Sequence, residues 1–140
     1  MKRLSFTPIA VGAAAVVFAA TAAAGAPSNA SVVIRHQLRG CHAWSVDSGP
    51  YRAAQRLTLA RGSSMTVVDD DVMPHTLVKT HGPAVQLTGK VAMRHMGASV
   101  KVRFTKAGTY RFTTKAGEDY MTGVKTVGED NVLTLTVVVS

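Results

Sequence analysis

Apolar and polar residues alternate along most of the chain after residue 31. Lys101 separates Val100 from Val102, for example, and Thr136 separates Leu135 from Val137. Because successive side chains of a strand point to opposite faces, a period of two predicts strands with one buried face. This alternation predicts seven strands, at residues 32–38, 56–59, 65–68, 75–80, 100–104, 110–114 and 133–139.

The chain after residue 24 lacks the apolar stripe of an amphipathic helix in any window of about 11 residues. Short strands that are separated by Gly- and Pro-containing turns therefore predict an all-β fold, a Greek-key β-sandwich. Two stretches show no clear alternation, and we expect residues 40–52 and 80–98 to be loops. Both contain histidine, and loops of this length in a compact domain are commonly functional.

The first residues have the pattern of a secretory signal peptide. A positive start at Lys2 and Arg3 is followed by an apolar run over residues 9–20. Three alanines at 22–24 complete the pattern, which predicts a cleaved signal peptide over residues 1–24. A membrane anchor is the alternative, but the run is short and rich in alanine, whereas a spanning helix needs roughly 20 strongly apolar residues.

Export defines the expected organisation of the chain. We expect a flexible leader at residues 25–31 and one domain at 32–140. The mature protein is then secreted or periplasmic, in the cell envelope, and does not span the membrane. The chain has one cysteine, so no disulfide can form within it.

Composition and charge exclude several classes of protein. With 46% hydrophobic and 17% charged residues, the chain is too apolar for a disordered protein. Lys plus Arg is 16 and Asp plus Glu is 8, but the basic residues are scattered over the predicted strands, which argues against nucleic acid as a partner. The sequence also lacks a Gly-x-Ser-x-Gly motif, a phosphate-binding loop and a His-Glu-x-x-His motif. We therefore do not expect an enzyme.

Residues 56–76 resemble the middle of a cupredoxin, one of the plastocyanin-like copper proteins. In this segment a turn at Gly62 leads into a strand, then into an acidic loop, and then into Pro74 and His75. The resemblance implies a cupredoxin-like sandwich, with His75 as a copper ligand.

Residues 102–123 are similar to the C-terminal hairpin of the same family. Tyr110 and Phe112 match its aromatic pair, and Met121 falls at the position of the weak axial ligand. Thr114, however, stands where the family has cysteine, and no histidine lies between Thr114 and Met121. The resemblance thus implies a copper site whose missing thiolate and imidazole come from elsewhere in the chain.

Cys41 and His42 are the candidates for these missing ligands. The resemblance places their loop at the same end of the sandwich as the copper-ligand loops, so Cys41 and His75 should lie close together. Thiolate, imidazole and thioether donors suit copper, and coordination would protect a lone thiol in an oxidising compartment. A small buried apolar cysteine is the alternative. Adjacent residues of a regular strand point to opposite faces, so a shared metal needs an irregular backbone, which Gly40 permits.

The remaining candidates are weighed by their surroundings. His95 lies beside Met96, and a His-Met pair can hold Cu(I). His36 shares a strand face with Val32 and Ile34, which indicates an edge or core histidine. The acidic run 69–71 lacks the spacing of a calcium loop and indicates a solvated turn. The predicted metal ligands are Cys41, His42, His75, His95 and Met121.

These observations predict an exported copper-binding protein with a rearranged Cys/His/Met site. Electron transfer with a redox partner protein and copper carriage are both compatible with such a site. A metal-free sandwich that serves protein binding or envelope structure is the alternative.

Overall fold

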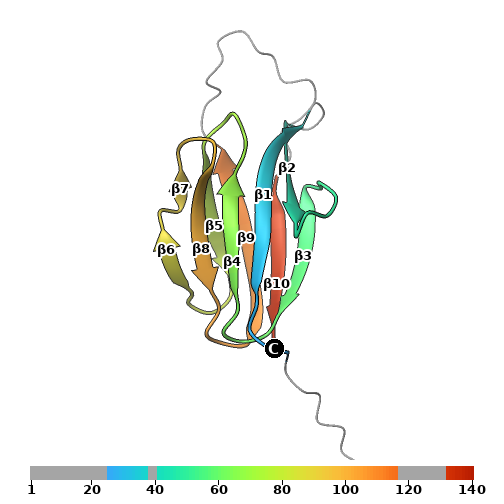
Figure 1. Cartoon of the computed structure of the whole chain (residues 1–140), viewed down its shortest axis with the longest axis vertical. Coiled ribbons are helices and arrows are strands. Elements are labelled where there is room, and N and C mark those ends of the chain that lie inside the picture. The colour runs from blue at the N-terminus through green and yellow to red at the C-terminus, as the bar shows by residue number, and fades with distance from the viewer. Residues whose placement is uncertain (1–24, 38–40, 117–131) are drawn as a thin grey trace, which may run out of the picture.

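The computed structural model describes residues 25–37, 41–116 and 132–140 (Figure 1). The predicted signal peptide, Gly40 and Met121 lie outside these residues. The described residues form two five-stranded sheets and contain no helix that is long and apolar enough to cross a membrane. The strands are β1 (Asn29–Gln37), β2 (Cys41–Val46), β3 (Ala54–Leu59), β4 (Ser64–Asp69), β5 (His75–His81), β6 (Gln86–Gly89), β7 (Ala92–Met93), β8 (Ala98–Arg103), β9 (Gly108–Ala116) and β10 (Thr134–Val139).

The order of the strands confirms the predicted all-β, Greek-key sandwich. One sheet runs β2-β1-β4-β8-β6 and the other runs β3-β10-β9-β5-β7. The chain changes sheets at every connection from β2–β3 to β8–β9. As a result, β1 pairs in parallel with β4, and β10 pairs in parallel with β3, although neither pair is consecutive in the sequence. Such crossovers between two sheets are typical of a Greek key.

The alternating residues fill the space between the sheets. Val100 and Val102 of β8 are fully buried, while Lys101 and Arg103 between and after them are exposed. Full burial of one aliphatic side chain contributes about 1.5–3 kcal/mol, so this face supplies much of the stability. The largest buried core side chains are Trp44, Tyr110, Phe104, Ile34, Met65, Met93, Leu133 and Leu135.

Two predicted loops contain strands. Residues 40–52 include β2, in which the first five residues are all buried, so no alternation marks it. Residues 80–98 include β6, whose four residues are all exposed, and the two-residue β7. Alternation requires one buried and one solvated face. A strand that is buried on both sides and an edge strand that is exposed on both sides therefore escape it.

One end of the sandwich gathers the segments that carry the candidate ligands. β1 ends and β2 begins at this end, which is uppermost in Figure 1 and opposite the C-terminus. The connection from β4 to β5 lies at the same end, because β4 runs parallel to β1 and Asp69, its last residue, is opposite Ile34 near the end of β1. Segments that are far apart in the sequence thus meet around one small volume.

Candidate metal centre

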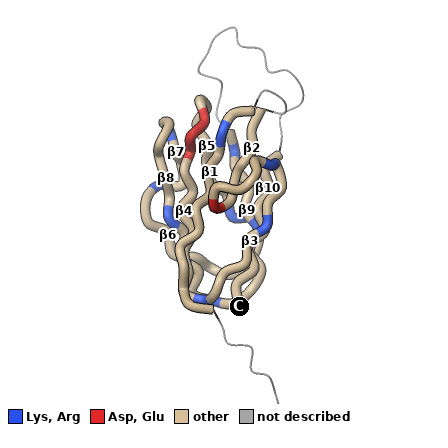
Figure 2. Tube along the Cα trace, turned by 45° about the vertical axis from the view of Figure 1, so that its right-hand side comes forward, with Lys and Arg blue, Asp and Glu red and all other residues tan. Residues whose placement is uncertain are grey.

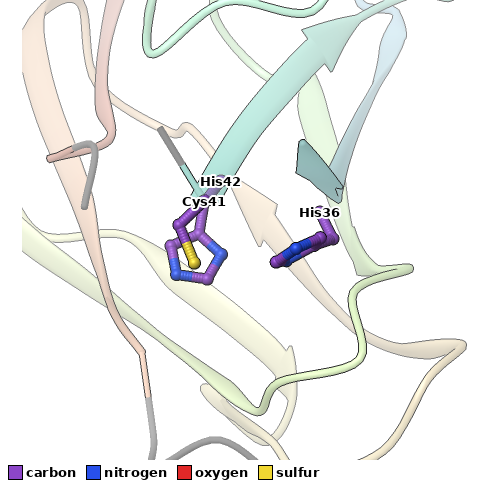
Figure 3. A group of neighbouring side chains, drawn as sticks. All are labelled: His36, Cys41 and His42. Carbon is purple, nitrogen blue, oxygen red and sulfur yellow. The ribbon is translucent and has the colours of Figure 1, made fainter. Parts of the chain in front are cut away.

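The β1–β2 hairpin carries three possible metal ligands. His36 and His42 are direct partners across the two antiparallel strands, and Cys41 pairs with Gln37. One donor atom from each of His36, Cys41 and His42 lies within 4.8 Å of the other two. Figure 3 shows the three side chains extending into the same space from the hairpin. Cross-strand partners share a face of the sheet, which explains why the two imidazoles meet.

An irregular backbone at Cys41 lets two neighbouring side chains turn inward. The φ angle of Cys41 is 61°, in the left-handed region. Such a conformation costs a residue other than glycine about 1–2 kcal/mol. Cys41 and His42 are then both buried, with 1% and 3% of their surface exposed. The irregularity that a shared site requires therefore lies at Cys41 itself.

The turn between β4 and β5 is closed by two buried aspartates. Asp69 accepts hydrogen bonds from the backbone N–H groups of Asp71 and His75, at 3.1 and 3.0 Å. Asp71 accepts one from the N–H of Met73 at 3.2 Å. Asp69 and Asp71 expose 0% and 2% of their surface, so the prediction of a solvated turn is wrong for both. Aspartate readily bonds to backbone N–H groups two residues on, which folds the turn inward around these carboxylates.

Asp71 lies between three histidines. Its Oδ2 atom is 2.7 Å from Nδ1 of His42 and 3.0 Å from Nε2 of His75. Its Oδ1 atom is 3.7 Å from Nδ1 of His36. Burial alone raises the pKa of the Asp71 carboxyl, but the hydrogen bonds with His42 and His75 outweigh it and hold that pKa well below its ordinary value. The pKa of Asp69, in contrast, is raised by burial.

His75 also faces the strand that resembles the family's cysteine-bearing hairpin. Its side chain is fully buried, and Nδ1 lies 3.0 Å from Oγ1 of Thr114 on β9. Thr114 stands at the position where the family has its sulfur ligand. A hydroxyl therefore occupies the place next to His75 where a thiol would be expected.

Negative charge is concentrated at this end of a basic molecule. The described residues hold four acidic side chains, and three of them are Asp69, Asp70 and Asp71. Lys and Arg are spread over both sheets (Figure 2). Asp70 points outward and bonds to Arg35 at 2.7 Å, so it belongs to the surface of this end. The lowered pKa of Asp71 favours its charged form, and a negative charge at this end favours a cation.

The structure brings together three of the predicted ligands. The rings of His42 and His75 lie 4.7 Å apart, centre to centre, which confirms that the Cys41–His42 pair and His75 share one end of the sandwich. His95 is exposed between β7 and β8, with Nδ1 3.1 Å from the carbonyl oxygen of Met96. It belongs to neither donor cluster found among the described residues. Met121 lies outside those residues.

Sequence reasoning missed two members of the site. Asp71 joins His42 and His75 in a second, fully buried cluster whose donor atoms also lie within 4.8 Å of one another. The sequence predicts His36 at a sheet edge or in the core, but its side chain is 36% exposed and belongs to the cluster with Cys41 and His42. If β2 is recognised as the second strand of a hairpin with β1, the register of the two strands pairs His36 with His42. This hairpin is the sequence signal that could have identified His36 as a member of the site.

Comparisons with known proteins add little to this geometry. No protein-family profile and no curated protein matches the sequence. A purple cupredoxin from Nitrosopumilus maritimus aligns with a TM-score of 0.45 and 17% identity, over 79% of this chain and 98% of that one. A cysteine protease inhibitor from Entamoeba histolytica aligns with a TM-score of 0.41 and 9% identity, over 83% and 100%. A reduced amicyanin variant aligns with a TM-score of 0.41 and 16% identity, over 77% and 80%. Such low scores assign neither a family nor a site.

Proposed function

We propose that this chain is an exported copper-binding protein of the cupredoxin type, which acts in electron transfer or copper carriage. The observation that carries the proposal is the convergence of His36, Cys41 and His42 at one end of the sandwich, with donor atoms within 4.8 Å of one another. His75 lies beside them across the Asp71 carboxylate and is a further candidate. Met121 remains a predicted ligand, and this geometry does not need His95.

The donor set fits copper in both chemistry and spacing. Two imidazoles and a thiolate are donors that suit copper, and zinc accepts the same donors. Donors on one tetrahedral ion, with bonds of about 2.0–2.3 Å, lie roughly 3.3–3.8 Å apart. The donor atoms of the cluster lie within 4.8 Å of one another, which is compatible with this spacing. Copper bound here would supply one-electron redox chemistry.

The burial of the donors supports a site that is held by the protein and reached from one side. Cys41 and His42 are buried, and they are anchored in a strand whose next residues pack in the core. His36 keeps about a third of its side chain exposed. A rigid inner pair changes little between the two copper oxidation states, which favours electron transfer, and a reachable outer ligand provides a point of entry for the metal.

Copper retention and visible absorption test the proposal. The purified protein is loaded with copper, exchanged into metal-free buffer and analysed for bound metal and for a thiolate-to-copper absorption band. His36→Ala should reduce retention at least roughly tenfold, because it removes one donor. His81→Ala is the matched control, since His81 is exposed at the far end of β5, about 20 Å from His75.

The same experiment can overturn the proposal. A wild-type protein that keeps no copper and stays colourless would favour a metal-free module. Equal loss of copper from His36→Ala and His81→Ala would show that the metal is held non-specifically by surface histidines. The proposal requires that only the variant at the hairpin loses its metal.

A further inference from the structure

One carboxylate oxygen joins two of the candidate ligands. Oδ2 of Asp71 lies 2.7 Å from Nδ1 of His42 and 3.0 Å from Nε2 of His75. The two imidazole planes are almost perpendicular, at 89°, so they approach this oxygen from different directions. All three side chains are almost completely buried, and the other carboxylate oxygen, Oδ1, accepts a hydrogen bond from the N–H of Met73.

The distances identify hydrogen bonds rather than the separations of a metal site. Two light-atom donors on one tetrahedral ion, with bonds of about 2.0–2.1 Å, would be roughly 3.3 Å apart. Values of 2.7 and 3.0 Å are those of N–H···O bonds. A proton therefore lies between Asp71 and each ring, and the edges of the rings that face Asp71 do not hold a metal in this arrangement.

The chemistry of the carboxylate then decides which ring atom carries the proton. The same oxygen, Oδ2 of Asp71, lies at hydrogen-bond distance from a nitrogen of each ring, and a carboxylate oxygen that is shared in this way acts as the acceptor of both hydrogen bonds. Both histidines must therefore donate, His42 through Nδ1 and His75 through Nε2. A metal-binding imidazole is neutral and has a single N–H. The lone pairs of the two rings are thus on Nε2 of His42 and on Nδ1 of His75.

We infer that Asp71 is a positioning residue that fixes the tautomers and orientations of His42 and His75, and so presents Nε2 of His42 and Nδ1 of His75 to the metal. The part of this inference that concerns metal rests on the proposed function. A carboxylate behind a metal-binding imidazole orients the ring and raises its basicity. Here one buried carboxylate serves two rings, and Nδ1 of His75 faces Thr114, where the resembling family has its sulfur.

The tautomers can be measured without any metal. Two-bond ¹H–¹⁵N correlation spectra of the purified, ¹⁵N-labelled, metal-free protein, recorded near pH 8, distinguish a protonated from an unprotonated ring nitrogen. We expect the proton on Nδ1 of His42 and on Nε2 of His75. The exposed His81 serves as an internal reference for a ring that Asp71 does not contact. A proton on Nε2 of His42 or on Nδ1 of His75 would overturn the inference.

Substitution of Asp71 tests the effect on metal affinity. Asp71→Asn keeps the size of the side chain but removes its charge and replaces one oxygen by an NH₂ donor, which then faces either the two rings or the N–H of Met73. The shared acceptor of the two rings is therefore weakened or lost, and the tautomers should no longer be fixed. Affinity for Cu(I), measured by competition with a chromophoric chelator, should fall roughly 10–100-fold. Asp70→Asn is the matched control, because Asp70 bonds to Arg35 on the surface. A folded Asp71→Asn variant with unchanged ring spectra and unchanged Cu(I) affinity would contradict the proposal.

The two proposals fail in different ways. If the wild-type protein does not bind copper, the proposed function is lost, and the metal-free spectra alone decide whether Asp71 fixes the two tautomers. If copper binds but the tautomers are reversed, the function stands and the role of Asp71 is wrong. If Asp71→Asn does not fold, the wild-type spectra still decide the inference.

Discussion

Two neighbouring regions at the same end of the sandwich offer a metal different donors. The β1–β2 hairpin presents nitrogen, sulfur and nitrogen from His36, Cys41 and His42. The β5–β9 pair presents His75 with the hydroxyl of Thr114 3.0 Å from its Nδ1. Sulfur is therefore present in one region and replaced by oxygen in the other. A threonine hydroxyl is a poor ligand for copper because its oxygen is hard and normally protonated.

The comparison shows that two strand pairs bring different donor atoms to the same end of the sandwich. In the family that residues 102–123 resemble, the sulfur comes from the C-terminal hairpin, at the position of Thr114 here. In this chain Cys41, at the start of β2, brings a sulfur atom to this end, and its left-handed backbone turns the side chain inward. His75 lies between the two positions, linked to the first through Asp71 and to the second through Thr114.

The largest expected effect comes from removing the sulfur of the hairpin. Cys41→Ser should abolish any strong visible band of the copper-loaded protein, because no thiolate remains to give it. Copper retention should fall by more than the roughly 100-fold that marks the upper range for loss of an outer hydrogen-bond partner. Visible absorption and metal analysis measure both effects. Unaltered colour and affinity in a folded variant would show that the hairpin is not the site.

A second prediction concerns Asp71, whose carboxylate links His42 of the hairpin with His75 of β5. Asp71→Asn weakens this link in the metal-free protein. The pKa of Asp71 is lower in the folded chain than in the unfolded chain, so its charge stabilises the fold above about pH 4. This contribution is lost as the pH falls below that value. At pH 7, Asp71→Asn should therefore lower the free energy of unfolding by about 1.5–3 kcal/mol, the range for a hydrogen bond to a charged group.

Denaturant unfolding at pH 7 and near pH 3 measures this difference. The difference in the free energy of unfolding between wild type and Asp71→Asn should be smaller at the lower pH. Asp69 has the opposite effect, because its raised pKa makes its ionisation costly in the fold, but it is present in both proteins. A difference in the free energy of unfolding that stays constant or grows at low pH would contradict the assigned role of the Asp71 charge.

A third prediction gives the second region the sulfur that it lacks. Thr114→Cys places a thiol beside Nδ1 of His75 with little change in volume, so stability should change by less than about 1.5 kcal/mol. The new thiol should shift the visible spectrum of the copper-loaded protein. In the Cys41→Ser background, Thr114→Cys should restore a band. An unchanged spectrum in both backgrounds would place Thr114 away from the metal.

The smallest effect is expected at the surface of the same end. Arg35 and Asp70 form an ion pair with side chains that are 54% and 35% exposed. Such pairs contribute about 0–1 kcal/mol. Arg35→Ala should therefore leave copper retention unchanged and lower thermal stability only slightly, and less so at high salt. A large loss of copper in this variant would extend the site to the surface.

The sequence predicts the strands of this fold wherever one face is buried. Alternation locates β8, β9 and β10, but it misses β2, because its first five residues are all buried. That omission also hides the pairing of His36 with His42, which requires the register of the hairpin. Asp71 is missed for another reason. An acidic triplet is ordinarily solvated, and only the inward fold of the β4–β5 turn makes it a buried partner of two histidines.

The neighbouring residues Cys41 and His42 predict a metal site through the chemistry of their side chains, and not through the alternation of apolar and polar residues. Thiol and imidazole side by side indicate a metal, and a regular strand would have separated them. The left-handed φ angle of Cys41 resolves this conflict, but the side chain gives no sign of it, since cysteine has no preference for that conformation. Backbone exceptions of this kind are set by tertiary structure.

The pairing of His36 with His42 also has a consequence for the order of assembly. Six positions separate these partners, whereas 29 positions separate His42 from Asp71. Contacts that are close in the sequence close faster than distant ones, because less chain entropy is lost. We therefore expect the three hairpin donors to meet early in folding, before Asp71 arrives from the β4–β5 turn. Copper present during folding would then encounter the three hairpin donors first, and the closing sandwich would retain it.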